Sequence, residues 1–307
     1  MTELDGADRL DPALRAIATE RTDFSPAAIQ LTREPFNERR RVSAQQTDAR
    51  DVRIVEDNAG GVPVRIYRGG PTPAPVVVYC HAGGFALGNL DTDHRQCVEL
   101  ARRGRCTVVS VDYRLAPEHP YPAALEDASA VLRWVVGDAA ALGVDPARLA
   151  VAGSSAGAAL AACLAHAAAD GALPPVVFQL LHQPVLDDRA TPSKAEFRTS
   201  PAFDGEGADL MWRYYLGPET ASGAAVPARR TEFVRLPPAL ISCAEIDPFR
   251  DEAIDYALRL LRAGVSAELH VFGRACHGFD SLLPEWSGSQ HLFALQGSAV
   301  SSALHGD

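Results

Sequence analysis

The 307-residue sequence predicts an α/β fold, with a mostly parallel β-sheet and helices on both of its faces. Apolar runs of strand length, such as 76–80 and 107–111, lack polar alternation and so predict strands that are buried on both sides. Helical stretches separate these runs, as expected for βαβ units. Hydrophobic residues make up 47% of the chain and charged residues 22%, which favours a large ordered core over disorder.

The N-terminal segment, residues 1–45, contains no strand pattern. Asp11-Pro12 and Ser25-Pro26 each place a capping residue before a proline, which is a signal for the start of a helix. We therefore expect short helices here, packed outside the sheet.

Runs in which apolar and polar residues alternate, as in strands, begin after residue 50. Two alternating runs, 52–55 and 62–67, flank a turn at 58–61 and predict an antiparallel hairpin. The further predicted strands are 76–80, 107–111, 149–152, 175–181, 239–243 and 267–272. The predicted helices between and after them are 92–103, 121–142, 156–169, 251–263 and 288–303.

Residues 188–232 interrupt the strand–helix alternation. They are polar and rich in Pro, Gly and Ala, with one aromatic helical patch at 210–216. We interpret the chain as a single domain, 1–307, whose cap is formed by 1–45 and 188–232; the alternative is a structural excursion without function. Candidate cap residues facing a site are Phe24, Phe36, Phe203, Trp212 and Tyr214.

Composition excludes several classes of partner. The net charge of −10 and the pI near 5.4 disfavour nucleic acid and anionic membrane surfaces. The acidic N-terminus lacks the apolar stretch of a secretory signal, and no run approaches the roughly 18 apolar residues of a membrane span. Six scattered cysteines without C-x-x-C spacing predict neither zinc nor disulfides, but reduced thiols in a cytoplasmic protein.

The pattern G-x-S-x-G occurs at Gly153, Ser155 and Gly157, between a predicted strand and a predicted helix. A sharp turn at that point exposes the serine hydroxyl at the end of the sheet, where it can act as a nucleophile. We expect glycine at 153 and 157 because a side chain there would clash within the turn.

A serine nucleophile needs a base, and nine histidines are available. Reactive groups gather where parallel strands end, which favours His277 after the strand 267–272 and, next, His81 after 76–80. His182 ends a strand and is a second-tier candidate. The remaining histidines are predicted within the fold (His166, His270) or in exposed polar surroundings (His94, His119, His291, His305).

The orienting acid is expected after a strand and before the histidine in the chain. Asp247, in the loop after strand 239–243, meets both conditions and completes the order Ser155, Asp247, His277. Glu245 and Asp251 are close alternatives: Glu245 comes early in the turn, and Asp251 falls in the first turn of the next helix.

An oxyanion hole requires backbone N–H groups that a substrate can approach closely. Gly83 and Gly84, just after strand 76–80, are predicted to supply two, and Ala156, directly after the nucleophile, a third. Taken alone, the glycine pair could equally form a plain turn.

Several longer motifs resemble the hormone-sensitive-lipase branch of α/β-hydrolase esterases. The resemblance runs from about residue 50 to 282. It rests on His81-Ala-Gly-Gly-Phe85, the block 112–127 (DYRLAPEHPYPAALED), Gly153-Ser-Ser-Ala-Gly157, Asp247-Pro-Phe-Arg-Asp-Glu252 and His277-Gly-Phe279. It implies an eight-stranded sheet beneath a helical cap, and hydrolysis of small to medium acyl esters or lactones through an acyl-serine. No metal or organic cofactor is implied, and a homodimer fits the family.

Two alternatives remain for proteins resembling this family: a dehydratase or cyclase acting on natural products through the same site, or a small-molecule binding protein.

The chain also departs from the family pattern twice. Ala82 replaces the first glycine of the usual three, which predicts a narrower acyl pocket. Ser154 stands where an acidic residue usually precedes the nucleophile, which predicts an altered hydrogen-bond network at the turn.

Overall fold

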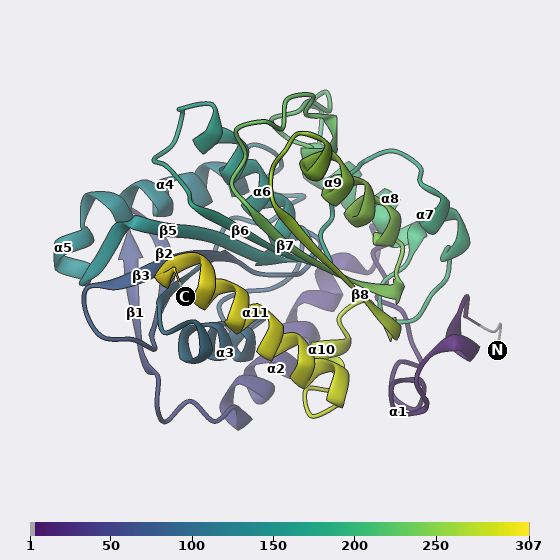
Figure 1. The fold of residues 1–307 in the computed structure, drawn as a ribbon. Coiled ribbons are helices and arrows are strands. Elements are labelled where there is room, and N and C mark those ends of the chain that lie inside the picture. Colours follow the sequence, from purple (N-terminus) through teal and green to yellow (C-terminus); the bar gives the residue numbers. More distant parts are fainter. Residues whose placement is uncertain (1–3, 307) are drawn as a thin grey trace.

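An eight-stranded sheet runs through the computed structural model, which describes residues 4–306 (Figure 1). Its strands are β1 (Arg53–Ala59), β2 (Val62–Arg68), β3 (Ala74–Cys80), β4 (Thr107–Val111), β5 (Val144–Ser154), β6 (Phe178–His182), β7 (Ala239–Ile246) and β8 (Ala267–Cys276). They are ordered β1-β2-β4-β3-β5-β6-β7-β8. Only β2 is antiparallel to its neighbours, so the predicted hairpin and the mostly parallel sheet are confirmed.

Helices follow most strands. They are α1 (Pro12–Arg15), α2 (Ile29–Gln46), α3 (His94–Gly104), α4 (Ala123–Gly137), α5 (Ala139–Leu142), α6 (Ala156–Ala169), α7 (Pro192–Glu196), α8 (Gly205–Leu216), α9 (Arg250–Arg262), α10 (Phe279–Leu282) and α11 (Ser287–His305), with short 3-10 turns at Ala7–Arg9 and Pro227–Arg229.

Alternate residues of the strands pack into two hydrophobic cores, one on each face of the sheet. Val76 and Val78 of β3 pack in the core that includes α4, α6 and α9, whereas Val77 and Tyr79 pack in the core that includes α3 and α11. Figure 1 shows these two helical layers on opposite sides of the sheet. A strand buried on both faces needs no polar alternation, which explains the continuous apolar runs.

Several of the observed boundaries differ from the predicted ones. β5 begins at Val144 rather than 149, and β8 continues to Cys276, so His277 directly follows the strand. The predicted helix 121–142 is split at Asp138 into α4 and α5. Asp11 caps α1 as predicted, but Ser25 only closes a turn through its carbonyl, and α2 begins at Ile29.

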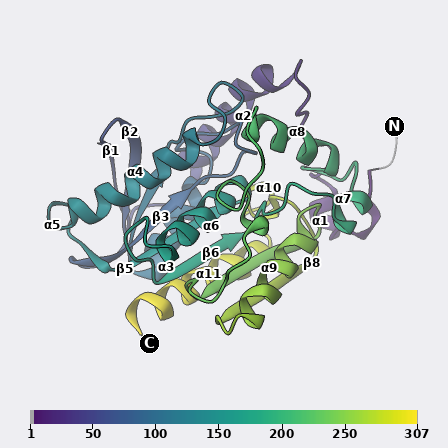
Figure 2. The same ribbon diagram turned by 90° about the horizontal axis from the view of Figure 1, so that it is seen from above.

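The N-terminal segment packs against the inserted segment after β6. Arg21 forms ion pairs with Asp204 (2.9 Å) and Glu206 (2.7 Å). Thr22 donates its N–H to the Ala202 carbonyl at 2.9 Å, and the Phe24 carbonyl accepts from the Tyr214 hydroxyl at 2.8 Å. Seen from above (Figure 2), α2 and α8, and likewise α1 and α7, project onto the same part of the molecule, and Figure 1 shows that α7 and α8 lie above the level of α1 and α2. Residues 1–3 of the expected cap segment lie outside the described residues.

Within residues 4–306, no helix combines the length and the apolar character needed to cross a membrane. The six cysteines are all free and buried.

Candidate active site

Ser155 stands at a sharp turn between β5 and α6, with φ 56° and ψ −120°. This backbone conformation is strained for a residue with a Cβ atom, and it presents the hydroxyl group at the end of the sheet. A Cβ atom at Gly153 would overlap with the backbone of Gly157, and one at Gly157 with the carbonyl of Cys80 in β3. Both glycines are therefore required by close backbone approach, as predicted.

His277 joins the serine to an aspartate. Its Nε2 lies 2.9 Å from Ser155 Oγ, and its Nδ1 lies 2.9 Å from Asp247 Oδ2. All three side chains are buried, with Asp247 fully inaccessible and 8% of His277 exposed. The structure brings together the three residues that were predicted from three separate strand ends.

The second oxygen of Asp247 accepts the N–H of Phe249 at 2.8 Å, which fixes the carboxylate plane. The two alternative acids are engaged elsewhere. Glu245 accepts from Arg9 and from the N–H of Arg274, and Asp251 accepts from Arg250 and the N–H of Ser193. Neither has a hydrogen bond to His277.

The loop after β3, residues 81–85, is called the oxyanion loop below. Gly83 and Gly84 have φ values of 134° and 60°, which favour glycine. A Cβ atom would overlap with the Leu87 carbonyl at the first and with the Phe24 ring at the second. Among the described residues, nothing accepts a hydrogen bond from the N–H of Gly83, Gly84 or Ala156. Three donors are thus free for a ligand.

His81 anchors this loop and does not contact Ser155. Its ring stacks on Tyr113 at 4.2 Å between centroids, and its Nδ1 lies 2.7 Å from the carbonyl of Ala82. The N–H of Ala82 donates to Asp93 at 2.8 Å, and Asp93 also accepts from the Tyr79 hydroxyl at 3.1 Å. Burial lowers the pKa of His81 and raises the pKa of Asp93.

His182 is also fully buried and remote from the serine hydroxyl. Its Nδ1 lies 2.9 Å from Ser242 Oγ and its Nε2 3.2 Å from Asp280 Oδ1. Its carbonyl, however, accepts the N–H of Ser155 at 2.8 Å. His182 therefore supports the turn through its backbone, and the structure favours His277 as the histidine at the serine.

Two of the four histidines predicted in exposed surroundings are not exposed. His94 is half-buried, 3.0 Å from the Tyr67 hydroxyl, and burial lowers its pKa to about 4. His305 is also half-buried and lies 3.1 Å from the carbonyl of Gly104. His119 and His291 are exposed, as expected.

A cavity of about 630 Å³ opens above Ser155 and His277. This large cavity has the size of a typical small-molecule site. Of the candidate cap residues, Phe24, Phe36 and Phe203 line it. Trp212 is buried against Phe85, and Tyr214 ties α8 to the N-terminal segment, so neither faces the cavity.

Gln183, which no sequence pattern singled out, follows β6 in the left-handed conformation, with φ 45°. Its Oε1 accepts the N–H of Gly278 at 2.6 Å, and its Nε2 donates to the carbonyl of Cys276 at 3.4 Å. These two bonds fix the backbone of the residues directly before and after His277. The sequence signal that could have pointed to Gln183 is its position after a predicted strand and directly before a proline.

Both departures from the family pattern lie at the site. Ala82 and Ser154 line the large cavity, and Ala82 contributes both its backbone groups to anchoring the oxyanion loop. The Ser154 side chain has no hydrogen bond to any described residue. Within residues 4–306, no three His, Cys, Asp or Glu side chains are arranged to hold a metal ion.

Comparisons with known proteins find several similar esterases. Residues 77–281 match a family model described as alpha/beta hydrolase fold. Esterase LipI of Mycobacterium tuberculosis is 39% identical over 293 residues, covering 91% of this chain and 92% of the relative. Carboxylesterase NlhH of the same species is 42% identical over 244 residues, covering 75% and 76%. The crystal structure of esterase LipW from Mycobacterium marinum is 67% identical, with a TM-score of 0.97 over 98% of both chains.

Proposed function

The chain belongs to the bacterial esterase branch of the hormone-sensitive lipase family and is a serine carboxylesterase, and we propose that Ser155, His277 and Asp247 are its catalytic triad. The observation that carries the assignment is the continuous chain of two 2.9 Å hydrogen bonds from Ser155 through His277 to Asp247.

In the proposed mechanism, His277 Nε2 accepts the Ser155 proton as the hydroxyl attacks the ester carbonyl. Asp247 holds the imidazole in the tautomer that leaves Nε2 free and stabilises the imidazolium that forms. His277 then donates this proton to the leaving alcohol. Water, activated by the same histidine, hydrolyses the acyl-serine and restores the free hydroxyl.

The tetrahedral oxyanion is bound by the N–H groups of Gly83, Gly84 and Ala156 in this proposal. Ala156 is the first residue of α6, so the partial positive charge at the helix N-terminus adds to the stabilisation. Removal of one such donor from an oxyanion hole typically costs about 100-fold or more in kcat.

We further propose that the chain is a single domain whose cap is formed by 1–45 and 188–232. In support, the two segments are joined by ion pairs and backbone hydrogen bonds, and Phe24, Phe36 and Phe203 face the large cavity from them. A volume of about 630 Å³ suits small to medium acyl esters or lactones.

A cytoplasmic location and a homodimer are also proposed. Six buried free thiols support a reducing compartment. Exposed Leu258 and Leu261 on α9, and Val271 on the edge strand β8, support self-association. Light scattering on the purified protein checks the second proposal: a mass of one chain at working concentration would contradict it.

The test of function combines turnover with labelling. We expect purified protein to hydrolyse p-nitrophenyl butyrate and to be inactivated by a p-nitrophenyl phosphonate, with the adduct located on Ser155 by mass spectrometry. An adduct on another residue would contradict the triad. If the protein hydrolyses no ester but binds a small molecule saturably, the result would favour a binding protein. If it hydrolyses no ester but converts a non-ester substrate, the result would favour a dehydratase or cyclase.

A further inference from the structure

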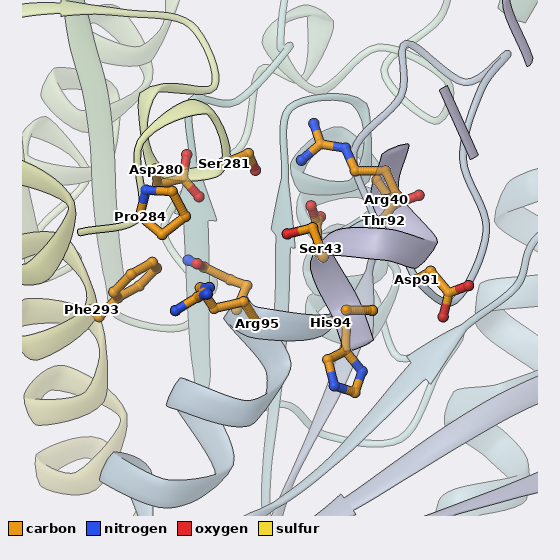
Figure 3. Close-up of a pocket in the computed structure, with 13 residues that line it drawn as sticks. Arg40, Ser43, Asp91, Thr92, His94, Arg95, Asp280, Ser281, Pro284 and Phe293 are labelled. Atoms are coloured by element: carbon orange, nitrogen blue, oxygen red, sulfur yellow. The ribbon is translucent and has the colours of Figure 1, made fainter. Parts of the chain in front are cut away.

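Beside the large cavity lies a second, much smaller one of about 20 Å³, called the small polar cavity here. Arg40 of α2, Asp93 at the start of α3 and Asp280 of α10 all line it. Figure 3 shows the Arg40 side chain extending from α2 toward Asp280 and Ser281 of α10. Arg40 and Asp280 also line the large cavity. The small polar cavity thus joins an N-terminal helix to two carboxylates behind the site.

Arg40 differs from other arginines of the same helix. Arg33 forms an ion pair with Glu118 at 2.7 Å, and Arg41 with Glu38 at 2.6 Å. The Arg40 guanidinium lies 5.0 Å from the centre of the Phe36 ring and, among the described residues, has no carboxylate within ion-pair distance. A half-buried cation without a direct partner is costly unless nearby negative charge offsets it.

Asp93 is one of the two nearby carboxylates, and it holds the oxyanion loop. It is 8% exposed, and its Oδ2 accepts the N–H of Ala82, the residue that precedes Gly83. An ionised carboxylate is a much stronger acceptor for this N–H than a protonated one. The orientation of the Gly83 and Gly84 amides therefore depends on Asp93 remaining ionised.

Asp280 is the other carboxylate, and it supports the nucleophile. It is 7% exposed and lies 3.2 Å from His182 Nε2. The carbonyl of that histidine accepts the N–H of Ser155. Each carboxylate facing Arg40 is thus linked by a short chain of hydrogen bonds to a different part of the site.

We propose that Arg40 is a positioning residue, whose charge across the small polar cavity keeps Asp93 ionised and so holds the amides of the oxyanion loop in place. The proposal rests on the esterase function proposed above. It assigns to an N-terminal cap helix a direct part in assembling the site, without contact between Arg40 and the reacting atoms.

The electrostatics of the surroundings support this role. Burial raises the pKa of Asp93, whereas the Arg40 charge lowers it. The pKa of Asp280 is lowered by His182 in the first place and by Arg40 to a smaller degree. The other titratable groups that face Asp93 are Tyr79, His81, Cys97, Tyr113 and Asp280. Burial disfavours the charged forms of the tyrosines, the cysteine and His81, and Asp280 is a like charge. Arg95 also lines the small polar cavity but pairs with Glu285 at 3.2 Å, so Arg40 is the arginine there that has no ion-pair partner among the described residues.

The consequence is a defined pH dependence. Without the Arg40 charge, the pKa of Asp93 rises, so a larger fraction is protonated at a given acidic pH and the oxyanion loop loosens. The acid limb of kcat then moves to higher pH, while activity recovers as the pH rises and Asp93 ionises again.

The experiment compares Arg40→Met and Arg40→Lys with wild type, using p-nitrophenyl butyrate across the range from about pH 5 to 9. We expect Arg40→Met to lose about tenfold in kcat near pH 6 and much less near pH 9, with KM changed less than about twofold. Arg40→Lys restores the charge and should recover most of kcat. Arg41→Gln, which removes a charge one residue away but outside both cavities, is the matched control and should match wild type.

A second comparison isolates Asp93. In an Asp93→Asn background, which cannot titrate, Arg40→Met should change kcat less than about twofold and shift no acid limb. Superimposable wild-type and Arg40→Met pH profiles, a loss confined to KM, or failure of Arg40→Lys to restore kcat would each overturn the proposal. Failure of the esterase function itself would appear differently, as absent turnover in wild type.

Discussion

Two Ser–His–Asp arrays lie in this molecule, and their atoms are spaced alike. In the proposed triad, His277 lies 2.9 Å from both Ser155 Oγ and Asp247 Oδ2. In the second array, His182 lies 2.9 Å from Ser242 Oγ and 3.2 Å from an oxygen of Asp280. Residue types and distances alone do not distinguish them.

The surroundings of the two arrays distinguish them. Ser155 sits on the strained turn beside three unengaged N–H groups and lines a large cavity, whereas Ser242 lies within the regular strand β7 and is 1% exposed. The order on the ring is also reversed, because Ser242 faces Nδ1 of its histidine and Asp280 faces Nε2. A carbonyl carbon can reach the first serine and not the second, so we assign catalysis to one array and structural support to the other.

The serines test this contrast most strongly. Ser155→Ala should lower kcat by roughly four to six orders of magnitude, because no nucleophile remains. Ser242→Ala should keep kcat within about threefold of wild type. Steady-state hydrolysis of p-nitrophenyl butyrate measures both, and an equal loss in the two variants would erase the distinction.

Replacing the histidines should separate activity from stability. His277→Ala should cost at least about a thousandfold in kcat with little change in the free energy of unfolding. His182→Ala leaves buried Asp280 and Ser242 without a partner and should destabilise the fold by about 3 kcal/mol. Urea unfolding followed by circular dichroism gives the second quantity. If His277→Ala kept near-full activity, another base would have to be sought.

The aspartates should follow with smaller effects. Asp247→Asn should lower kcat by about a thousandfold or more, because the amide can favour the wrong tautomer of His277. Asp280→Asn has no contact with His277 and acts mainly through His182 and the Ser155 turn, so we expect a loss of about tenfold or less. The ratio of the two losses, measured at one pH, is the informative number; a ratio near unity would contradict the assignment.

The smallest expected effect on kcat comes from modifying the cysteine that lies beside each array. Cys276 precedes His277 and Cys243 follows Ser242. Burial raises the pKa of Cys276 to about 12 and raises that of Cys243 as well, so both thiols stay protonated and unreactive at neutral pH. Incubation of the folded protein with iodoacetamide should leave kcat unchanged, and rapid inactivation would show that one of these thiols is accessible.

Much of the site could be predicted because catalysis in this fold uses positions at strand ends. Ser155, Asp247 and His277 each follow an apolar run that is recognisable as a strand, so topology alone brings them near one another. The glycines of the turn and of the oxyanion loop are equally visible, because their backbone positions exclude a Cβ atom.

The supporting residues could not be predicted in this way. Asp93 and Asp280 look like ordinary polar residues near helix starts, and their importance comes from partners distant in the chain. His94 illustrates the same limit: it falls in a polar stretch, yet the hydroxyl of Tyr67 in β2 covers it. Such contacts follow from packing between elements rather than from any local pattern.

The pairing of Arg21 with Asp204 has a consequence for how the protein is made. The two residues are separated by 183 positions. At a synthesis rate of about 5 to 20 residues per second, the N-terminal segment leaves the ribosome roughly 10 to 40 seconds before its partner exists. During that interval Phe24, which is 2% exposed in the finished protein and packs with its ring 5.0 Å from that of Phe203, has no inserted segment to pack against.

The proposed cap is therefore completed late, although one half of it is translated first. Slow codons between residues 24 and 202 would lengthen that exposure, so the yield of active enzyme should depend on translation speed across this stretch.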